Sequence, residues 1–244
     1  MFFFSKSRPV LQDIIQDYVD IHSHLLPGID DGAQDFETTV SLLRSLQAIG
    51  FTQFTATPHI IKNIWDNTKN SIETVKAATD KQLVEQNISV HFRAAAEYMM
   101  DDSFTKLIAS EPLLTLKENY VLVEMSYINP PMQLYDILFE LKVAGYQAVL
   151  AHPERYLFYH SNVEEYKKLK KAGCLLQLNL LSAVGYYGKS VAKTAQLLLD
   201  KGLIDFTGSD VHHDKHIKSF SKKLEISNVQ GLKDAIGRNE FFRI

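Results

Sequence analysis

Histidine, aspartate and glutamate residues stand at the ends of several short apolar runs in this 244-residue sequence. His22 and His24 follow the first run, and Asp210 and His212 follow the last. Residues two positions apart on a strand point to the same face, so each pair can bind one ion or two adjacent ions. Four other runs also end in ligand-type side chains, namely His59, Glu97, Glu124 and His152. Imidazole and carboxylate groups together suit zinc, manganese or iron.

Two of these carboxylates follow strongly apolar residues, so a folded chain would bury them. Glu97 comes after three alanines, and Glu124 ends the run VLVE. A lone carboxylate in apolar surroundings is costly, and a bound cation removes that cost. A single histidine at a strand end is commonly a hydrogen-bonded structural residue. Ligand-type residues at six strand ends together favour a metal centre.

The elements that must position these residues alternate between short β-rich runs and longer helical patterns. The expected strands cover residues 18–22, 53–57, 88–95, 120–124, 147–151, 175–179 and 203–207. The expected helices cover residues 36–49, 71–85, 103–110, 132–144, 163–172 and 191–200, with Asp35 as the N-cap of the first. This alternation, with glycines after the helices, predicts βα units and a parallel sheet. Active-site residues of such folds gather at the carboxyl ends of the strands.

About seven βα units fill the chain, which predicts one α/β domain rather than two. We expect this domain to cover residues 17–244. Residues 1–16, with the apolar residues 2–4, are expected to form an N-terminal tail. The pattern alone is compatible with a closed barrel or with an open doubly wound sheet.

The composition argues against several classes of protein. The net charge is −3, whereas proteins that bind the nucleic-acid backbone are usually basic. No apolar run approaches the roughly 18 residues of a membrane span, so we expect no transmembrane segment and a cytoplasmic location. The single cysteine excludes an intrachain disulfide. Cysteine phosphatases use the motif C-x5-R, but Leu180 stands six residues after Cys174.

The motifs around the strand ends together resemble the PHP (polymerase and histidinol phosphatase) superfamily of metal-dependent phosphoesterases. The nearest likeness is to its bacterial protein-tyrosine phosphatase branch, which is linked to capsule and exopolysaccharide operons. The motifs that carry the resemblance are DIHSH at 20–24, LLPGIDDG at 25–32, ATPH at 56–59, AE at 96–97, LVE at 122–124, AHPERY at 151–156 and GSDVH at 208–212. The resemblance implies a single-domain distorted (β/α)7 barrel.

The resemblance also implies up to three metal ions, with Mn²⁺ as the usual ion and Fe or Zn as alternatives. By position, the first metal site would use His22, His24, Glu97 and Asp210. The second would use Glu97, Glu124 and His152, and the third would use Asp31, His59 and His212. Asp30 adjoins Asp31, and the sequence leaves open which of them is a ligand. We favour Asp31, because it directly precedes Gly32.

The implied reaction is hydrolysis of phosphotyrosine by a metal-activated hydroxide. Glu97, His152 and Arg155 are the expected catalytic residues, and Arg155 is expected to bind the phosphate with its guanidinium fork. The branch often has a second arginine after its last motif; here Lys215, His216 or Lys218 would replace it. Residues 126–132 and the pair Tyr186 and Tyr187 are candidate rim elements. The family suggests a bacterial tyrosine kinase as the partner.

Three other functions fit parts of the pattern. A small-molecule phosphomonoesterase, such as a histidinol phosphatase, would use the same motifs. Related barrels hydrolyse C–N bonds, but Arg155 favours a phosphate over an amide. A non-catalytic metal-binding regulator is disfavoured, because every expected ligand position is filled.

Overall fold

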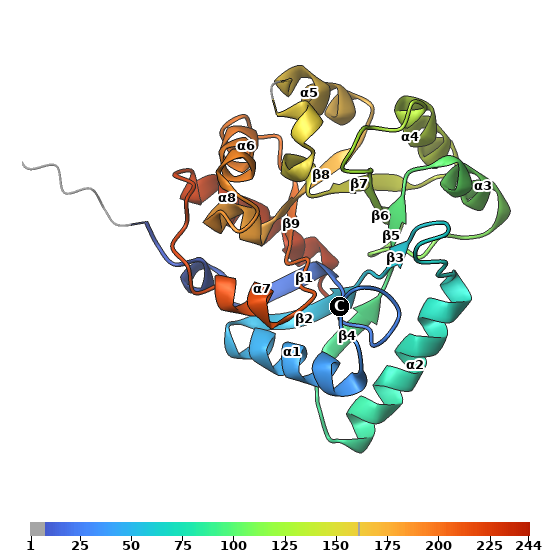
Figure 1. Ribbon diagram of the computed structural model, residues 1–244, viewed down its shortest axis with the longest axis vertical. Coiled ribbons are helices and arrows are strands. Elements are labelled where there is room, and N and C mark those ends of the chain that lie inside the picture. The colour runs from blue at the N-terminus through green and yellow to red at the C-terminus, as the bar shows by residue number, and fades with distance from the viewer. Residues whose placement is uncertain (1–7, 161) are drawn as a thin grey trace, which may run out of the picture.

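In the computed structural model, which describes residues 8–160 and 162–244, parallel strands form a ring surrounded by helices (Figure 1). The strands of the described residues are β1 (Tyr18–Ser23), β2 (Phe51–Ala56), β3 (His59–Ile60), β4 (His91–Ala94), β5 (Glu97–Met99), β6 (Tyr120–Glu124), β7 (Gln147–Ala151), β8 (Leu175–Asn179) and β9 (Phe206–Gly208). One sheet has the order β1-β2-β4, and the other has the order β3-β5-β6-β7-β8-β9. All neighbouring strands pair in parallel, as predicted.

The predicted strands at 53–57 and 88–95 overlap β2 and β4, and a second short strand that was not predicted, β3 or β5, begins just after each of them. β2 and β3 are separated at Thr57 and Pro58, where proline has no N–H to donate to a ladder. The pairing nevertheless continues across the break. The N–H of Ala95 donates to the carbonyl of Ala56 at 2.8 Å, and that of Glu97 donates to Pro58 at 3.1 Å. The nine short strands therefore occupy seven positions around the ring in the described part of the chain.

The ring closes between β9 and β1. An isolated parallel bridge joins Ser23 to Val211. The N–H of Asp210 donates to the carbonyl of His22 at 2.8 Å, and that of His24 donates to Val211 at 2.9 Å. The fold is therefore a closed barrel rather than an open doubly wound sheet.

Helices cover the outside of the ring. Among the described residues they are α1 (Phe36–Ala48), α2 (Lys69–Glu85), α3 (Asp102–Ser110), α4 (Leu134–Val143), α5 (Val163–Lys171), α6 (Lys189–Asp200), α7 (Asp214–Ser219) and α8 (Val229–Arg238). The first six match the predicted helices closely, whereas α7 and α8 were not predicted. The predicted N-cap of α1 is confirmed, since the Asp35 carboxylate accepts from the N–H of Thr38 at 2.8 Å. Within residues 8–160 and 162–244, no helix is both long and apolar enough to cross a membrane.

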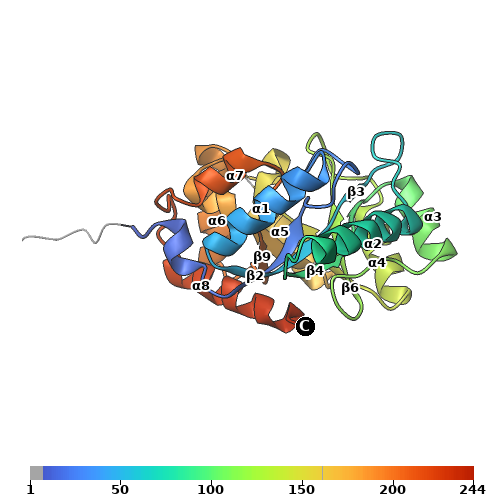
Figure 2. The same cartoon turned by 90° about the horizontal axis from the view of Figure 1, so that it is seen from below.

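The two ends of the barrel differ in what fills them. A small apolar core from the strands, including Val19, Leu122 and Val149, packs with Phe242 of the C-terminal segment. Figure 2 shows α8 and the C-terminus at one end, and α7 with the loops after β1 and β3 at the other. The carboxyl ends of the strands are thus free for a functional site.

The N-terminal segment contributes to the larger core between strands and helices. Leu11 and Ile15 are fully buried there, and Val10 forms a bridge with Lys223. Residues 8–16 therefore pack on the barrel, and the domain boundary at residue 17 stays a prediction. The apolar residues 2–4 lie outside the described residues.

Candidate metal centre

All nine predicted metal ligands lie together at the carboxyl ends of the strands. Their ligand atoms form four overlapping groups, and within each group these atoms lie within 4.8 Å of one another. The groups are His22, His24 and Asp210; His22, Glu97 and His152; His59, Glu97 and Glu124; and His24, Asp31, His59 and His212. The barrel topology accounts for this, because parallel strands bring residues distant in sequence to one end.

Glu97 is the centre of this cluster. Its carboxylate lies 3.3 Å from Nε2 of His22, 3.1 Å from Nδ1 of His59 and 3.0 Å from Nε2 of His152. The Glu97 side chain is fully buried at the start of β5. A carboxylate surrounded in this way can bridge two cations, which is the arrangement that the sequence predicts.

The β1 histidines share a second carboxylate. Oδ1 of Asp210 lies 3.3 Å from Nε2 of both His22 and His24. Its other oxygen, Oδ2, accepts from Arg155 at 2.7 Å and from the Asn179 amide at 2.9 Å. Asp210 therefore presents one oxygen to the histidines and is held in place through the other.

The two adjacent aspartates have different surroundings. Asp30 is buried and accepts from Nδ1 of His24 at 2.7 Å and from the N–H of Gly32 at 2.9 Å. Asp31 is about half exposed, and its Oδ1 lies 3.4 Å from Nε2 of His212 and 3.6 Å from Nε2 of His59. Asp30 thus orients a histidine, while Asp31 lies beside the His59 and His212 rings. This geometry favours Asp31 as the ligand.

Unpartnered polar atoms test whether these residues fit a metal. Among the described residues, five buried side-chain nitrogen or oxygen atoms have no hydrogen-bond partner. Four belong to the predicted ligands: Nδ1 of His59, Oε2 of Glu97, Oε1 of Glu124 and Nδ1 of His152. Buried polar atoms are almost always paired, so this group of unpaired nitrogen and oxygen atoms fits the binding of a cation. The nitrogen and oxygen donor set suits Mn, Fe or Zn.

The protonation of the cluster depends on its carboxylates. Burial lowers the pKa of His22, but Glu97 and Asp210 oppose this effect and raise the pKa to about 10. Burial and the nearby Arg155 lower the pKa of His152 to about 4, so His152 is neutral at pH 7. Protons on histidine therefore balance the carboxylates when no cation is bound, and cations must displace those protons.

Arg155 lines a cavity of about 210 Å³ beside the cluster. Its guanidinium is held between two aromatic rings, 4.2 Å from the centroid of Tyr187 and 4.9 Å from that of Tyr127. The remaining lining residues are Asp31, Asp210, His212, His213 and His216. The cavity thus offers an oriented guanidinium next to the metal ligands, as the sequence predicts for a phosphate site.

The predicted replacements for a second arginine do not supply a cation to this cavity. Lys215 and Lys218 lie on the exposed side of α7 and do not line it. His216 lines the cavity but is buried, and burial with the neighbouring His213 and His212 lowers its pKa to about 3. Its ring is therefore neutral at pH 7. The sequence could not show which of these three residues lines the cavity, because it does not reveal which side of a short helix faces the site.

Residues 18–224 match the family described as capsular polysaccharide synthesis, CpsB/CapC. This chain belongs to the CpsB/CapC family. The predicted resemblance to the capsule-linked branch of tyrosine phosphatases is thereby confirmed.

Two relatives show how similar the chain is to known proteins. It is 28% identical to the tyrosine-protein phosphatase YwqE of Bacillus subtilis over 198 aligned residues. The alignment covers 81% of this chain and 78% of that protein. It is 26% identical to the tyrosine-protein phosphatase CpsB of Streptococcus pneumoniae over 202 aligned residues. That alignment covers 80% of this chain and 83% of the relative.

Crystal structures of YwqE and CpsB are described as those of unique metal-dependent tyrosine phosphatases. The matched structure gives a TM-score of 0.76 at 28% identity and covers 83% of this chain and 84% of that one. The predicted PHP-type barrel is confirmed by this likeness together with the closed ring of strands.

In this CpsB/CapC family member, β8 supplies neutral side chains to the centre. Oε1 of Gln177 accepts from Nδ1 of His22 at 2.8 Å, while Asn179 donates to Asp210. A Cβ at Gly208 would lie 2.5 Å from Nε2 of Gln177, so only glycine permits this packing. Sequence reasoning missed Gln177 and Asn179 because it searched for ionisable residues. Polar residues at alternate positions of an apolar strand were the available signal.

Two of the candidate ligands have left-handed backbone conformations. His152 has a φ of 38° and Asp210 has a φ of 50°. A non-glycine residue in this region costs about 1–3 kcal/mol, and such strain is concentrated at functional sites. The fold therefore tolerates strain in order to direct these two side chains into the cluster.

Proposed function

We propose that this chain is a metal-dependent protein-tyrosine phosphatase that hydrolyses phosphotyrosine. The observation that carries the proposal is the convergence of nine histidine and carboxylate side chains, with the buried Glu97 among them, next to the Arg155 cavity. Membership of the CpsB/CapC family and the tyrosine phosphatase names of the relatives support the same activity.

The proposed metal ligands are the nine residues that the sequence predicts, with Asp31 rather than Asp30 among them. They would hold up to three divalent cations, Mn²⁺ first and Fe or Zn as alternatives, and Glu97 would bridge two of them. When bound, divalent cations supply Lewis acidity, which activates water and offsets phosphate charge. Glu97 and His152 would act in catalysis as metal ligands.

The chain's own residues position the phosphate. The Arg155 guanidinium binds two phosphate oxygens with its planar fork, and Tyr127 and Tyr187 hold that fork in orientation. Asp210 couples this clamp to the ligand set, because one carboxylate contacts both Arg155 and the β1 histidines. The leaving tyrosinate has a conjugate-acid pKa of about 10, so it departs with less proton donation than an alkoxide needs.

The size of the neighbouring cleft supports a macromolecular substrate over a small one. The cleft that begins at Asp31, His59 and Glu124 has a volume of about 1290 Å³. Sites for small molecules typically have volumes of roughly 300–1,000 Å³. A histidinol-phosphate-like metabolite would leave much of this cleft unused.

The proposed partner is a bacterial tyrosine kinase phosphorylated on tyrosine, which fits the capsule-synthesis family. A cytoplasmic location belongs with this proposal, because a kinase that uses ATP would generate the substrate there. Neither a nucleic acid nor a lipid is required by the chemistry of the site.

A comparison of three substrates tests the function. Purified protein with Mn²⁺ is assayed for phosphate release from a phosphotyrosine peptide, a phosphoserine peptide of the same sequence and histidinol phosphate. We expect kcat/KM to be highest for the phosphotyrosine peptide and activity to disappear after chelation. A preference for histidinol phosphate would overturn the substrate class, and full activity after chelation would overturn the metal dependence.

A further inference from the structure

A long cleft leads away from the candidate metal centre. Three candidate ligands, Asp31, His59 and Glu124, line its inner end. The loop after β3 forms one wall, and the loop after β6 forms the other. Residues at the start of α3 line the cleft as well. The cleft is therefore continuous with the site that would hold the phosphate.

The two walls carry exposed apolar side chains. Ile64 on the first wall is 68% exposed, while Ile128 and Met132 on the second are 86% and 94% exposed. Tyr127 beside them is 46% exposed. Of the eleven large apolar side chains exposed in residues 8–160 and 162–244, these four line the cleft. Apolar side chains gathered around one opening mark a binding surface for another molecule.

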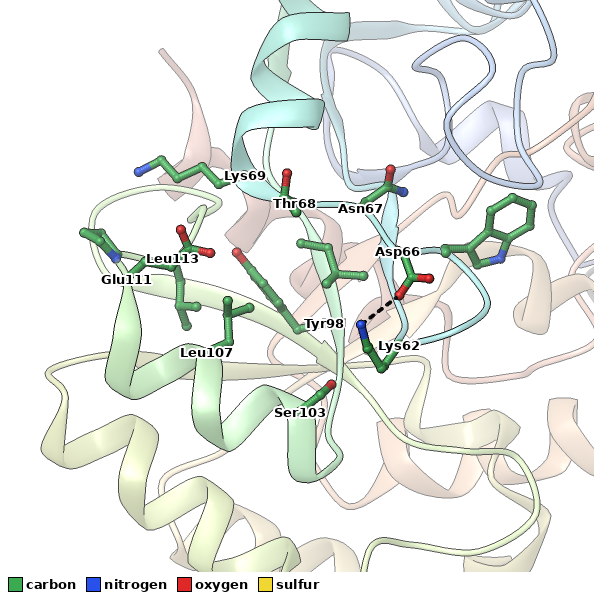
Figure 3. Close-up of a pocket in the computed structure, with 13 residues that line it drawn as sticks. Lys62, Asp66, Asn67, Thr68, Lys69, Tyr98, Ser103, Leu107, Glu111 and Leu113 are labelled. Atoms are coloured by element: carbon green, nitrogen blue, oxygen red, sulfur yellow. Dashed lines mark ion pairs between the residues drawn. The ribbon is translucent and has the colours of Figure 1, made fainter.

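A smaller pocket adjoins the cleft and shares Lys62, Trp65 and Ser103 with it. Its volume is about 190 Å³, and Tyr98, Leu107 and Leu113 line it (Figure 3). The figure also shows the ion pair of Lys62 and Asp66, 3.6 Å apart, at the rim. Such a pocket has room for one side chain of a bound polypeptide.

The charges along the cleft are balanced beyond the metal ligands. Apart from the candidate ligands, the charged lining residues are two lysines, Lys62 and Lys106, and two aspartates, Asp101 and Asp102. The Asp101 carboxylate already accepts from the N–H groups of Ser103 at 2.8 Å and Phe104 at 3.0 Å, as the cap of α3. The cleft therefore has little net charge to select an acidic or basic segment, and its apolar walls must provide the selectivity.

We propose that this cleft binds the polypeptide segment next to the phosphotyrosine and selects segments with apolar side chains. The inference rests on the proposed function, because a phosphate held at the metal centre sends the adjoining chain into the cleft. Met132 suits this task, since methionine adapts to different apolar partners. The occupant is thus a substrate polypeptide with aliphatic or aromatic residues near its phosphotyrosine.

Kinetics on three substrates test the proposal. The substrates are p-nitrophenyl phosphate and two phosphotyrosine peptides of equal charge, one with leucines beside the phosphotyrosine and one with serines. For the triple variant Ile64→Ser, Ile128→Ser and Met132→Ser, we expect kcat/KM on the leucine peptide to fall about tenfold, mainly through KM, as for a loss of about 1.4 kcal/mol in binding. The rate on p-nitrophenyl phosphate should not change. Val84→Ser is the control, because Val84 is 76% exposed and lies outside the cleft.

The single tryptophan gives a readout that does not depend on activity. Trp65 is the only tryptophan in the chain and lines the cleft. Titration with the unphosphorylated leucine peptide should shift its emission saturably in the wild type, and at least tenfold more peptide should be needed in the triple variant. If the triple variant folds poorly, Met132→Ser alone is used instead. It should also need more peptide than the wild type, by a smaller factor than the triple variant.

The outcomes separate this inference from the function on which it rests. Equal kcat/KM for both peptides in wild type and triple variant, or no change in Trp65 emission, would overturn the proposed role of the cleft. Neither result would contradict the phosphatase activity. Hydrolysis of p-nitrophenyl phosphate without hydrolysis of either peptide would instead overturn the proposed protein substrate, and the docking role with it.

Discussion

Gln177 offers a way to test the metal centre without removing a ligand. Its Oε1 accepts the Nδ1 proton of His22 at 2.8 Å, which leaves Nε2 of His22 free to bind a cation. The Gln177 amide nitrogen donates to the carbonyl of Leu178 at 2.8 Å, which fixes the orientation of the amide. Gln177→Met keeps roughly the length and volume of the side chain and removes the acceptor for His22, together with the hydrogen bond to the Leu178 carbonyl.

The expected effect follows from two independent magnitudes. An N–H left unpaired at a fully buried position costs about 1–3 kcal/mol. Loss of a hydrogen bond to a metal-ligating histidine typically weakens metal affinity or activity by about 10–100-fold, or about 1.4–2.7 kcal/mol. The two ranges agree. We therefore expect the Mn²⁺ concentration for half-maximal activity to rise about 10–100-fold, with most of kcat recovered at saturating Mn²⁺.

The assay is phosphate release from a phosphotyrosine peptide as a function of free Mn²⁺. Gln147→Met is the matched control. Gln147 is the first residue of β7, at the end of the strand away from His152, and its amide donates to the carbonyl of Gly173. Its Mn²⁺ dependence should equal that of the wild type. If Gln177→Met lowers the melting temperature but leaves the Mn²⁺ dependence unchanged, His22 does not bind the catalytic cation and the reasoning is refuted.

Three further predictions concern the clamp, the metal and the thiol. Arg155→Lys, which keeps the charge but loses the planar fork, should lower kcat/KM about 100-fold, whereas the exposed Lys215→Ala should stay within about twofold, as measured by phosphopeptide turnover. Chelation should lower the melting temperature by roughly 5–10 °C in a thermal scan, because cations at about 100 times Kd stabilise the fold by about 2.7 kcal/mol. Burial raises the pKa of Cys174 to about 12, so Cys174→Ala and iodoacetamide at pH 8 should leave the activity unchanged. Equal losses for Arg155→Lys and Lys215→Ala, an unchanged melting temperature, or inactivation by iodoacetamide would contradict the respective prediction.

The ligand cluster was predictable from the sequence because parallel strands converge. Apart from Asp31, which lies in the loop after β1 and was expected from the family resemblance, each ligand-type residue follows a short apolar run, and a parallel arrangement sends all such ends to one side of the fold. His22 lies two positions from His24, and Asp210 lies two positions from His212. This spacing alone places each pair on one face of a strand. Their proximity to Glu97 and His152 then followed from the fold class.

The parts that sequence reasoning missed depend on contacts across the barrel. Gln177 and Asn179 carry no charge and become functional only because β8 lies beside the residues they orient. The choice between His216 and Lys215 depended on which side of α7 faces the cavity, in a helix too short for a clear pattern. The cleft walls come from loops after β3 and β6, whose meeting no local pattern predicts.

The central claim is that nine strand-end side chains hold the catalytic cations. Crystals grown with Mn²⁺, with diffraction recorded at the manganese absorption edge, test it most directly. We predict anomalous peaks within coordination distance of the cluster around Glu97, with one near His22, His24 and Asp210. Crystals of active protein without anomalous density in this cluster, or with density only elsewhere, would contradict the account.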